Sequence, residues 1–217
     1  MKKIIVVGDS FTANPNGWPS QLASMLHLNL ISYGVSGEHW WGVKKFLDGV
    51  SMEDTEAIVF AHTFGNRIPT NNTQLGKHDF FNLDSNSEEQ LAIKLYYKYI
   101  QNDEFMDWAQ CRWFEQISNQ WSGPKLINLH CFPWTWDKRY HLRGTNVSPS
   151  LATISLNEID AQEFSLINDG RVNHFSDSNN TELARQLAQM ITHYSIGEVQ
   201  LDVTKFHQLT TRWLDWR

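Results

Sequence analysis

The chain has 217 residues, a formal net charge of −6 at pH 7 and a hydrophobic share of 41%. This length fits one globular domain, spanning residues 1–217, and is short for two domains. No apolar stretch approaches the roughly 20 residues of a membrane helix. The acidic balance, without a basic cluster, argues against nucleic acid or an anionic membrane as the main partner.

The first residues form an apolar run that predicts a strand rather than a signal peptide. Ile4-Ile5-Val6-Val7 is rich in β-branched residues and ends at Gly8, which is typical of a buried strand. The run continues into Gly8-Asp9-Ser10 without a small-residue cleavage site. Two cysteines, Cys111 and Cys131, are too few for a disulfide framework or a zinc knuckle, so we expect buried thiols. The expected location is therefore a reducing compartment, the cytoplasm.

Strand and helix patterns alternate along the chain. Short apolar runs that end at Gly or polar residues indicate strands, and apolar residues at the helical period indicate helices. The expected strands are 3–7, 28–33, 57–61 and 125–130, and the expected helices are 18–26, 41–47, 87–100, 103–120 and 181–194. This alternation predicts an α/β fold in which a parallel sheet carries helices on both faces.

Residues 68–122 form an insert between the third and fourth expected strands. Its first part, 68–86, is polar and predicts a loop, and Ser87 supplies a capping signal for the helices that follow. The insert either shapes a substrate pocket or is a peripheral helical pair. Residues 137–153 are interpreted as irregular. The extension 196–217 is interpreted as an added hairpin and short helix or as a dimerisation arm, which leaves a homo-oligomer open.

The ten tryptophans are the unusual part of the composition. They gather at Trp40-Trp41, Trp108–Trp121, Trp134–Trp136 and Trp213–Trp216. Carbohydrate-binding clefts use such rings as flat platforms, whereas most tryptophans pack in a protein core. The aromatic segments favour an acylated sugar or a short-chain ester as the small-molecule partner over a long lipid, because the sequence shows no extended aliphatic lid.

Two separated motifs indicate a nucleophile and its base. Ser10 follows the first strand directly, and His174 precedes the last clear helix. A serine hydroxyl attacks a carbonyl only when a positioned histidine takes its proton. Ligand sites in parallel sheets lie at the carboxyl ends of the strands, so Ser10 and His174 are expected to meet there through the fold. Asp9 is expected to be a structural turn residue.

Four blocks of sequence, in this order, resemble the SGNH, or GDSL-type, hydrolases. The blocks are Gly8-Asp9-Ser10, Tyr33-Gly34-Val35-Ser36-Gly37, Thr63-Phe64-Gly65-Asn66-Arg67 and Asp169-Gly170-Arg171-Val172-Asn173-His174. The resemblance spans nearly the whole chain and implies a flavodoxin-like three-layer α/β fold with esterase, lipase or carbohydrate deacetylase activity. It also implies Ser10 as nucleophile, His174 as base, and an oxyanion hole made by the N–H groups of Ser10 and Gly37 and the side chain of Asn66.

The third and fourth blocks depart from the family's pattern. The family's Gly-x-Asn-Asp is replaced by Gly65-Asn66-Arg67, so the glycine adjoins the asparagine and an arginine stands in place of the aspartate. Thr63 or Arg67 could hold the oxyanion role instead of Asn66. The family's Asp-x-x-His is also altered, and the nearest upstream acid is Asp169. Either Asp169 or a backbone carbonyl therefore orients His174.

Together these features predict a serine ester hydrolase that works through an acyl-enzyme intermediate. No cofactor is expected, and no metal ion, because His62, His130 and His141 lack the close spacing of metal ligands. The alternative is an inactive relative that keeps the fold and binds glycans or proteins through its aromatic segments. A nucleotide-binding loop is disfavoured, since Gly8-Asp9-Ser10-Phe11 lacks the required glycines and lysine.

Overall fold

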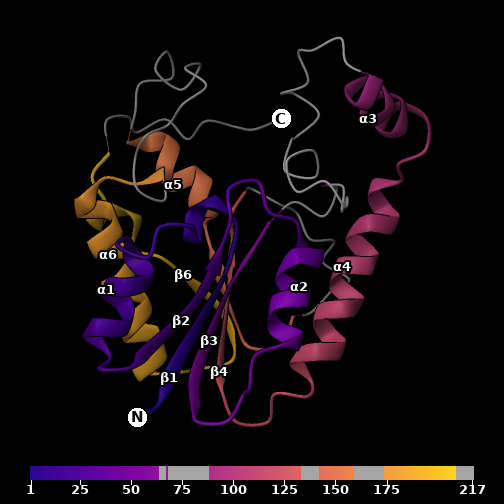
Figure 1. Cartoon of the computed structure of the whole chain (residues 1–217). Helices are drawn as coiled ribbons and strands as arrows, with labels where there is room; N and C mark the ends of the chain where they lie inside the picture. The colour runs from indigo at the N-terminus through magenta and orange to yellow at the C-terminus, as the bar shows by residue number, and fades with distance from the viewer. Residues whose placement is uncertain (64–66, 68–87, 133–141, 159–173, 209–217) are drawn as a thin grey trace.

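A six-stranded sheet lies between two layers of helices (Figure 1). The strand order is β2-β1-β3-β4-β5-β6, and every neighbouring pair is parallel. The first five strands follow the flavodoxin-like order, so the predicted fold class is confirmed. The structure is a computed structural model, and it describes residues 1–63, 67, 88–132, 142–158 and 174–208.

The central strands are buried on both faces, as their sequences predict. The strands are β1 Lys3–Gly8, β2 Asn29–Gly34, β3 Thr55–His62, β4 Lys125–His130, β5 Thr145–Ser148 and β6 Gly197–Gln200. Ile4 and Val6 belong to the hydrophobic core on one face of the sheet, whereas Ile5 and Val7 belong to the core on the other face. Successive side chains of a strand point to opposite faces, so a continuous apolar run supplies both cores at once.

Helices cover each face of the sheet. They are α1 Trp18–Met25, α2 Trp40–Asp48, α3 Glu88–Tyr99, α4 Asp103–Ser118, α5 Leu151–Asn157 and α6 Asp177–Thr192, with short 3-10 turns η1 Ser10–Thr12 and η5 Val203–Lys205. α1 and α6 lie on one face, and α2 and α4 lie on the other (Figure 1). No helix in the described part of the chain is both long and apolar enough to cross a membrane.

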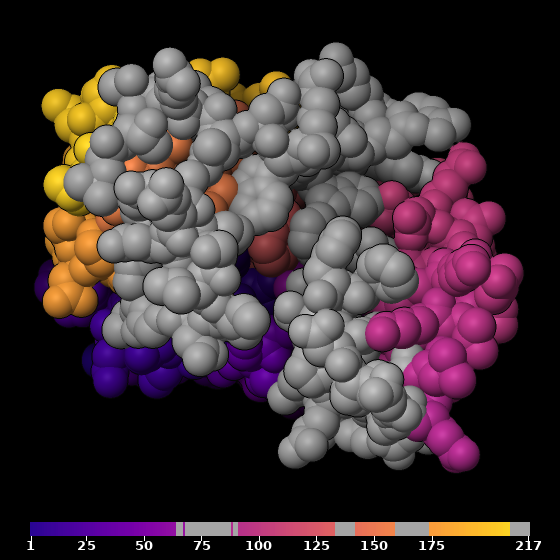
Figure 2. All heavy atoms as spheres, turned by 90° about the horizontal axis from the view of Figure 1, so that it is seen from above, coloured from indigo at the N-terminus to yellow at the C-terminus, as the bar shows by residue number. Residues whose placement is uncertain are grey.

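The helical insert between β3 and β4 is confirmed. Its second helix, α4, is more than a peripheral addition, because Trp113 and Phe114 pack into the core against β3. Seen from above, α3 and the start of α4 form one side of the upper face, and α5 and α6 form the opposite side (Figure 2). Residues 68–87, including the predicted loop and the cap at Ser87, lie outside the described residues.

Three elements differ from the prediction. β5 lies within 137–153, which the sequence indicated as irregular, and α5 begins in this segment and ends at Asn157. β5 has only four residues and one large apolar side chain, Val147, so its strand conformation depends on pairing with β4 and β6 rather than on its own sequence. The extension 196–217 does not begin as a hairpin: β6 runs parallel to β5 and widens the sheet.

Candidate active site

Ser10 is the first residue of η1 and lies two residues after Gly8, the last residue of β1. Asp9 caps this turn, and its carboxylate accepts a hydrogen bond from the Phe11 N–H at 3.1 Å. The Thr12 hydroxyl donates to the Asp9 carbonyl at 2.9 Å. Within the turn, Phe11 and Thr12 are buried and Ser10 is partly exposed, so Ser10 is the residue of η1 that a substrate can reach.

Glycines let the chain approach itself closely around this turn. A Cβ on Gly34 would lie 2.4 Å from the Thr12 backbone, which no real side chain tolerates. Gly37 has a φ of 71°, in the left-handed region that favours glycine. Since Gly8 pairs with Gly34 across the parallel strands β1 and β2, the turn of Ser10 and the loop of Gly37 leave the sheet at the same edge.

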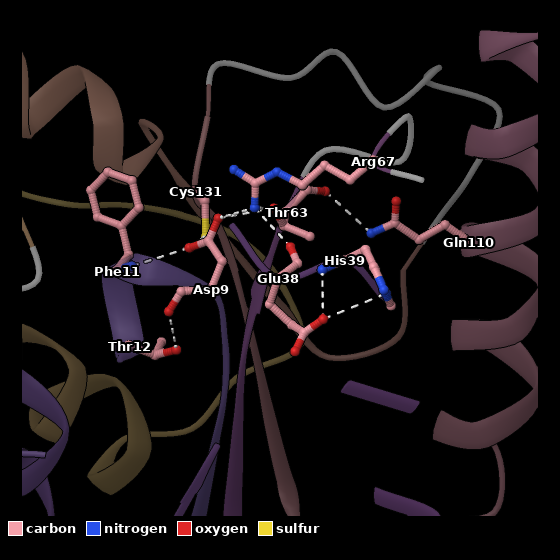
Figure 3. A network of polar contacts seen from close by, with 9 residues as sticks. All are labelled: Asp9, Phe11, Thr12, Glu38, His39, Thr63, Arg67, Gln110 and Cys131. Atoms are coloured by element: carbon pink, nitrogen blue, oxygen red, sulfur yellow. Dashed lines mark hydrogen bonds and ion pairs between the residues drawn. The ribbon is translucent and has the colours of Figure 1, made fainter. Parts of the chain in front are cut away.

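A buried ion pair between Arg67 and Asp9 anchors the turn (Figure 3). Nη1 of Arg67 lies 2.9 Å from Oδ2 of Asp9, and the same nitrogen donates to the Glu38 carbonyl at 2.7 Å. The Thr63 hydroxyl donates to Asp9 Oδ2 at 2.9 Å, and the Cys131 thiol donates to Oδ1 at 3.1 Å. These groups follow β2, β3 and β4, so Asp9 and Arg67 together connect the ends of neighbouring strands.

This network gives roles to three residues of the sequence blocks. Asp9 holds the turn, in agreement with the structural role expected of it. The alternatives to Asn66 as oxyanion donors were Thr63 and Arg67. The Thr63 hydroxyl and the Nη1 of Arg67 both donate to Asp9 instead, and Arg67 is only 3% exposed. Asn66 itself lies outside the described residues.

The two cysteines are free and buried, which confirms the expectation of buried thiols. Burial raises the pKa of the Cys131 thiol well above its usual range, and the nearby Asp9 carboxylate adds to this effect. Burial likewise raises the pKa of the Cys111 thiol. A thiol that keeps its proton donates a hydrogen bond and is a poor nucleophile, so Cys131 supports Asp9 instead of competing with Ser10.

Side-chain hydrogen bonds also hold the loop that carries Gly37. The carboxylate of Glu38 accepts from the Tyr33 hydroxyl at 2.5 Å and from the His39 N–H at 3.0 Å. His39 caps α2, because its Nδ1 accepts from the Gly42 N–H at 3.0 Å. Burial lowers the pKa of His39, so its imidazole stays neutral and remains an acceptor. The loop is therefore fixed where it enters α2.

His174 lies beside the turn of the candidate nucleophile. Its ring centroid is 4.8 Å from that of Phe11, the residue that follows Ser10. Its carbonyl accepts from the Ser155 hydroxyl at 2.6 Å, and the next residue, Phe175, is buried in the core. With a φ of 60°, His174 adopts a left-handed conformation that is uncommon outside glycine and often marks functional sites. The structure brings the Ser10 and His174 segments together; Asp169 lies outside the described residues.

Glu158 is a residue of this region that the sequence analysis missed. It is 6% exposed, and its carboxylate accepts from the Ser176 N–H at 3.0 Å and from the Ser176 hydroxyl. Ser176 caps α6, two residues after His174. Glu158 therefore stabilises the start of α6, where negative charge is favourable. No sequence spacing connects residues 158 and 176; the only signal is an acid just after the short amphipathic segment 151–157.

The histidines at the ends of β3 and β4 form a stacked pair in which His62 is buried and His130 is partly exposed. The rings of His62 and His130 stack at a centroid distance of 5.5 Å, and Nε2 of His62 lies 3.0 Å from Oδ1 of Asn128. Burial lowers the pKa of His62 well below its usual value and that of His130 to about 4. Within the described ranges, no three His, Cys, Asp or Glu side chains are grouped so that they could hold a metal ion. His141 lies outside these ranges.

The described tryptophans divide between core and surface. Trp18, Trp113 and Trp121 are buried, whereas Trp41 and Trp108 are 40% and 45% exposed. Packing in the core thus accounts for part of the high tryptophan content. The segments Trp134–Trp136 and Trp213–Trp216 lie outside the described residues.

Comparisons with known proteins found two similar solved structures, while no family model and no curated protein matches the chain. One, from Desulfitobacterium hafniense DCB-2, carries the name of a lipolytic protein of the G-D-S-L family; it is 15% identical, with a TM-score of 0.43, over 87% of this chain and 99% of that one. The other, from Parabacteroides merdae ATCC 43184, carries the name of a GDSL-like lipase; it is 10% identical, with a TM-score of 0.37, over 88% of this chain and 76% of that one. Both names belong to the family that the four sequence blocks resemble.

Proposed function

We propose that the chain is a serine ester hydrolase that acts on a small acyl ester or an acylated carbohydrate. The observation that carries this proposal is the packing of the His174 imidazole against Phe11, next to Ser10, at the carboxyl end of β1. The reaction needs a nucleophile and a base close together, although Ser10 and His174 are far apart in the sequence. Hydrogen bonds hold both segments in place, from the Phe11 N–H to Asp9 and from the Ser155 hydroxyl to the His174 carbonyl. The partly exposed Ser10 gives a substrate access to the turn.

The reaction has two halves that use the same groups. Ser10 Oγ attacks the ester carbonyl while His174 takes the hydroxyl proton, and the tetrahedral intermediate then expels the alcohol, which receives that proton from His174. Water, deprotonated by His174, attacks the acyl-enzyme, releasing the carboxylic acid and restoring Ser10. The N–H groups of Ser10 and Gly37 and the side chain of Asn66 bind the oxyanion in both halves. Asp169 or a backbone carbonyl orients His174.

The decisive experiment compares wild type with Ser10→Ala. We expect turnover of p-nitrophenyl acetate to fall by at least about 10³-fold in Ser10→Ala, because the nucleophile is removed. A fluorophosphonate should label the wild type, with the adduct mapped to Ser10 by mass spectrometry. Ser24→Ala, an exposed serine on α1, is the matched control and should keep full activity.

Equal turnover in wild type and Ser10→Ala would remove Ser10 from the mechanism. A wild type that neither hydrolyses esters nor takes the label, yet binds glycans, would instead be the inactive binding module. Substrate class is tested separately, with acetylated glycans and p-nitrophenyl esters of increasing chain length. A preference for long acyl chains would contradict the proposed small acyl group.

A further inference from the structure

We infer that Arg67 is a positioning residue, whose guanidinium fixes the turn of Ser10 relative to the loop of Gly37 and thereby sets the spacing of the oxyanion hole. The inference rests on the proposed hydrolase function. It assigns a task to the residue at which the third sequence block departs from the family's pattern, where arginine replaces aspartate.

The inference starts from what a single nitrogen atom of Arg67 contacts. Nη1 lies 2.9 Å from the carboxylate of Asp9 and donates to the carbonyl of Glu38 at 2.7 Å (Figure 3). Asp9 directly precedes Ser10, and Glu38 directly follows Gly37. One nitrogen therefore bridges the neighbours of the two residues whose backbone N–H groups are proposed to bind the oxyanion.

This bridge is rigid because it is buried and braced. The side chains of Arg67 and Asp9 are 4% and 0% exposed, so little water weakens their attraction. The Thr63 hydroxyl contacts both partners, donating to Asp9 and accepting from Arg67 at 2.5 Å. The ring of Phe132 lies 5.4 Å from the guanidinium carbon and packs against it. The Arg67 side chain is therefore held in one position, and it keeps the two loops at a fixed distance from each other.

A buried guanidinium cannot touch the substrate, so its effect on the reaction must pass through the two loops. Oxyanion donors act only when they lie at hydrogen-bond distance from the developing charge, and a misplacement of about 1 Å costs about 10² in rate. Lysine supplies the charge, but its ammonium is carried on a flexible stem and lacks the planar guanidinium that packs against Phe132 and fixes the direction of the bridging nitrogen. Substitution by lysine should therefore restore only part of the effect.

The experiment measures kcat and KM for p-nitrophenyl acetate in Arg67→Met and Arg67→Lys, normalised to the active sites that a fluorophosphonate labels. We expect kcat per active site to fall by about 10²-fold in Arg67→Met, with KM within about twofold of wild type, and by a smaller factor in Arg67→Lys. A purely structural role would lower the number of active sites and leave kcat per site unchanged.

Two further variants separate the outcomes. Arg143→Met removes another arginine hydrogen bond to a backbone carbonyl, that of Ser118, and should leave kcat unchanged. If Arg67→Met does not fold, Asp9→Asn combined with Arg67→Met removes both charges of the pair, so no buried charge is left alone, and it should show the same loss of kcat.

Wild-type kcat per site in Arg67→Met, an equal loss in Arg143→Met, or failure of every Arg67 variant to fold would overturn the inference while Ser10 labelling still stands. Absence of labelling in the wild type would instead remove the proposed function, and this inference with it.

Discussion

The fold holds the carboxyl group of Asp107 in surroundings that disfavour its negative charge. Its Oδ1 is buried and has no hydrogen-bond partner among the described residues. Burial, with a smaller effect of Asp103, raises the pKa of Asp107 to about 7. Between the ordinary carboxyl pKa and this value, the folded chain keeps a proton that the unfolded chain has released, so stability falls as pH rises through this window. We expect Asp107→Asn to raise the free energy of unfolding by about 1 kcal/mol at about pH 8.

Urea unfolding at about pH 8 and about pH 4 measures this gain, which should be mostly lost at the lower pH, because the carboxyl is then protonated in the folded chain and about half protonated in the unfolded chain. Glu104→Gln is the matched control on the same helix. Glu104 is exposed in the first turn of α4, where its charge is favourable, so its removal should give no gain. A gain of similar size in both variants would contradict the assignment to buried Asp107.

The places of single residues in the fold were predictable where a local sequence pattern marks them. Ser10 follows a short apolar strand, and Gly37 sits in a glycine-rich loop where the backbone needs a positive φ. The ion pair between Asp9 and Arg67 was not predictable, because it joins residues far apart in the chain through a departure from the expected motif. Both charges are buried because the ends of the strands pack together, and no sequence pattern near Asp9 predicts this burial.

At the scale of elements, the start of α6 controls where the His174 segment lies. Ser176 caps the helix, and the buried carboxylate of Glu158 accepts from its N–H at 3.0 Å. Glu158→Gln removes the negative charge from this helix N-terminus, so we expect the free energy of unfolding to fall by about 1 kcal/mol. Chemical denaturation measures the change. Glu198→Gln, on exposed β6, should change stability by less than about 0.5 kcal/mol; equal effects would mean that Glu158 does not stabilise α6.

Elements were predictable in proportion to the apolar residues that they bury. β1 and β3 are nearly continuous apolar runs, and α6 repeats Leu183, Leu187 and Ile191 on its buried face. β5 and β6 have four residues each and few large apolar side chains, so their conformation is decided by pairing with neighbouring strands. α6 also begins at Asp177, before the predicted start at Thr181, because its polar first turn is capped by Ser176.

At the scale of the whole molecule, two hydrophobic cores share one sheet, and the stacked pair of His62 and His130 lies at its carboxyl edge. His62 contacts the rings of Phe60 and Phe114, so it is part of the core on the α2 and α4 face. Aromatic packing of this kind leaves no room for hydration of a charged imidazole. A protonated histidine here would therefore oppose the packing of a whole layer of the fold.

The stability of the entire fold should fall in mild acid for this reason. Burial holds the pKa of His130 to about 4 and that of His62 well below its usual value, whereas in the unfolded chain both titrate near the ordinary value. As pH falls below about 6.5 the unfolded state binds protons that the folded state does not, so the free energy of unfolding decreases, by up to about 3 kcal/mol for His130 near pH 4.

His130→Gln cannot gain this charge, and its stability should depend less steeply on pH than that of wild type. Urea unfolding at about pH 7, 6 and 5 measures the slopes, and the exposed His193→Gln should keep the wild-type slope. Parallel pH profiles for wild type and His130→Gln would show that the stacked pair does not drive acid unfolding, and that the carboxylates shared by both proteins do.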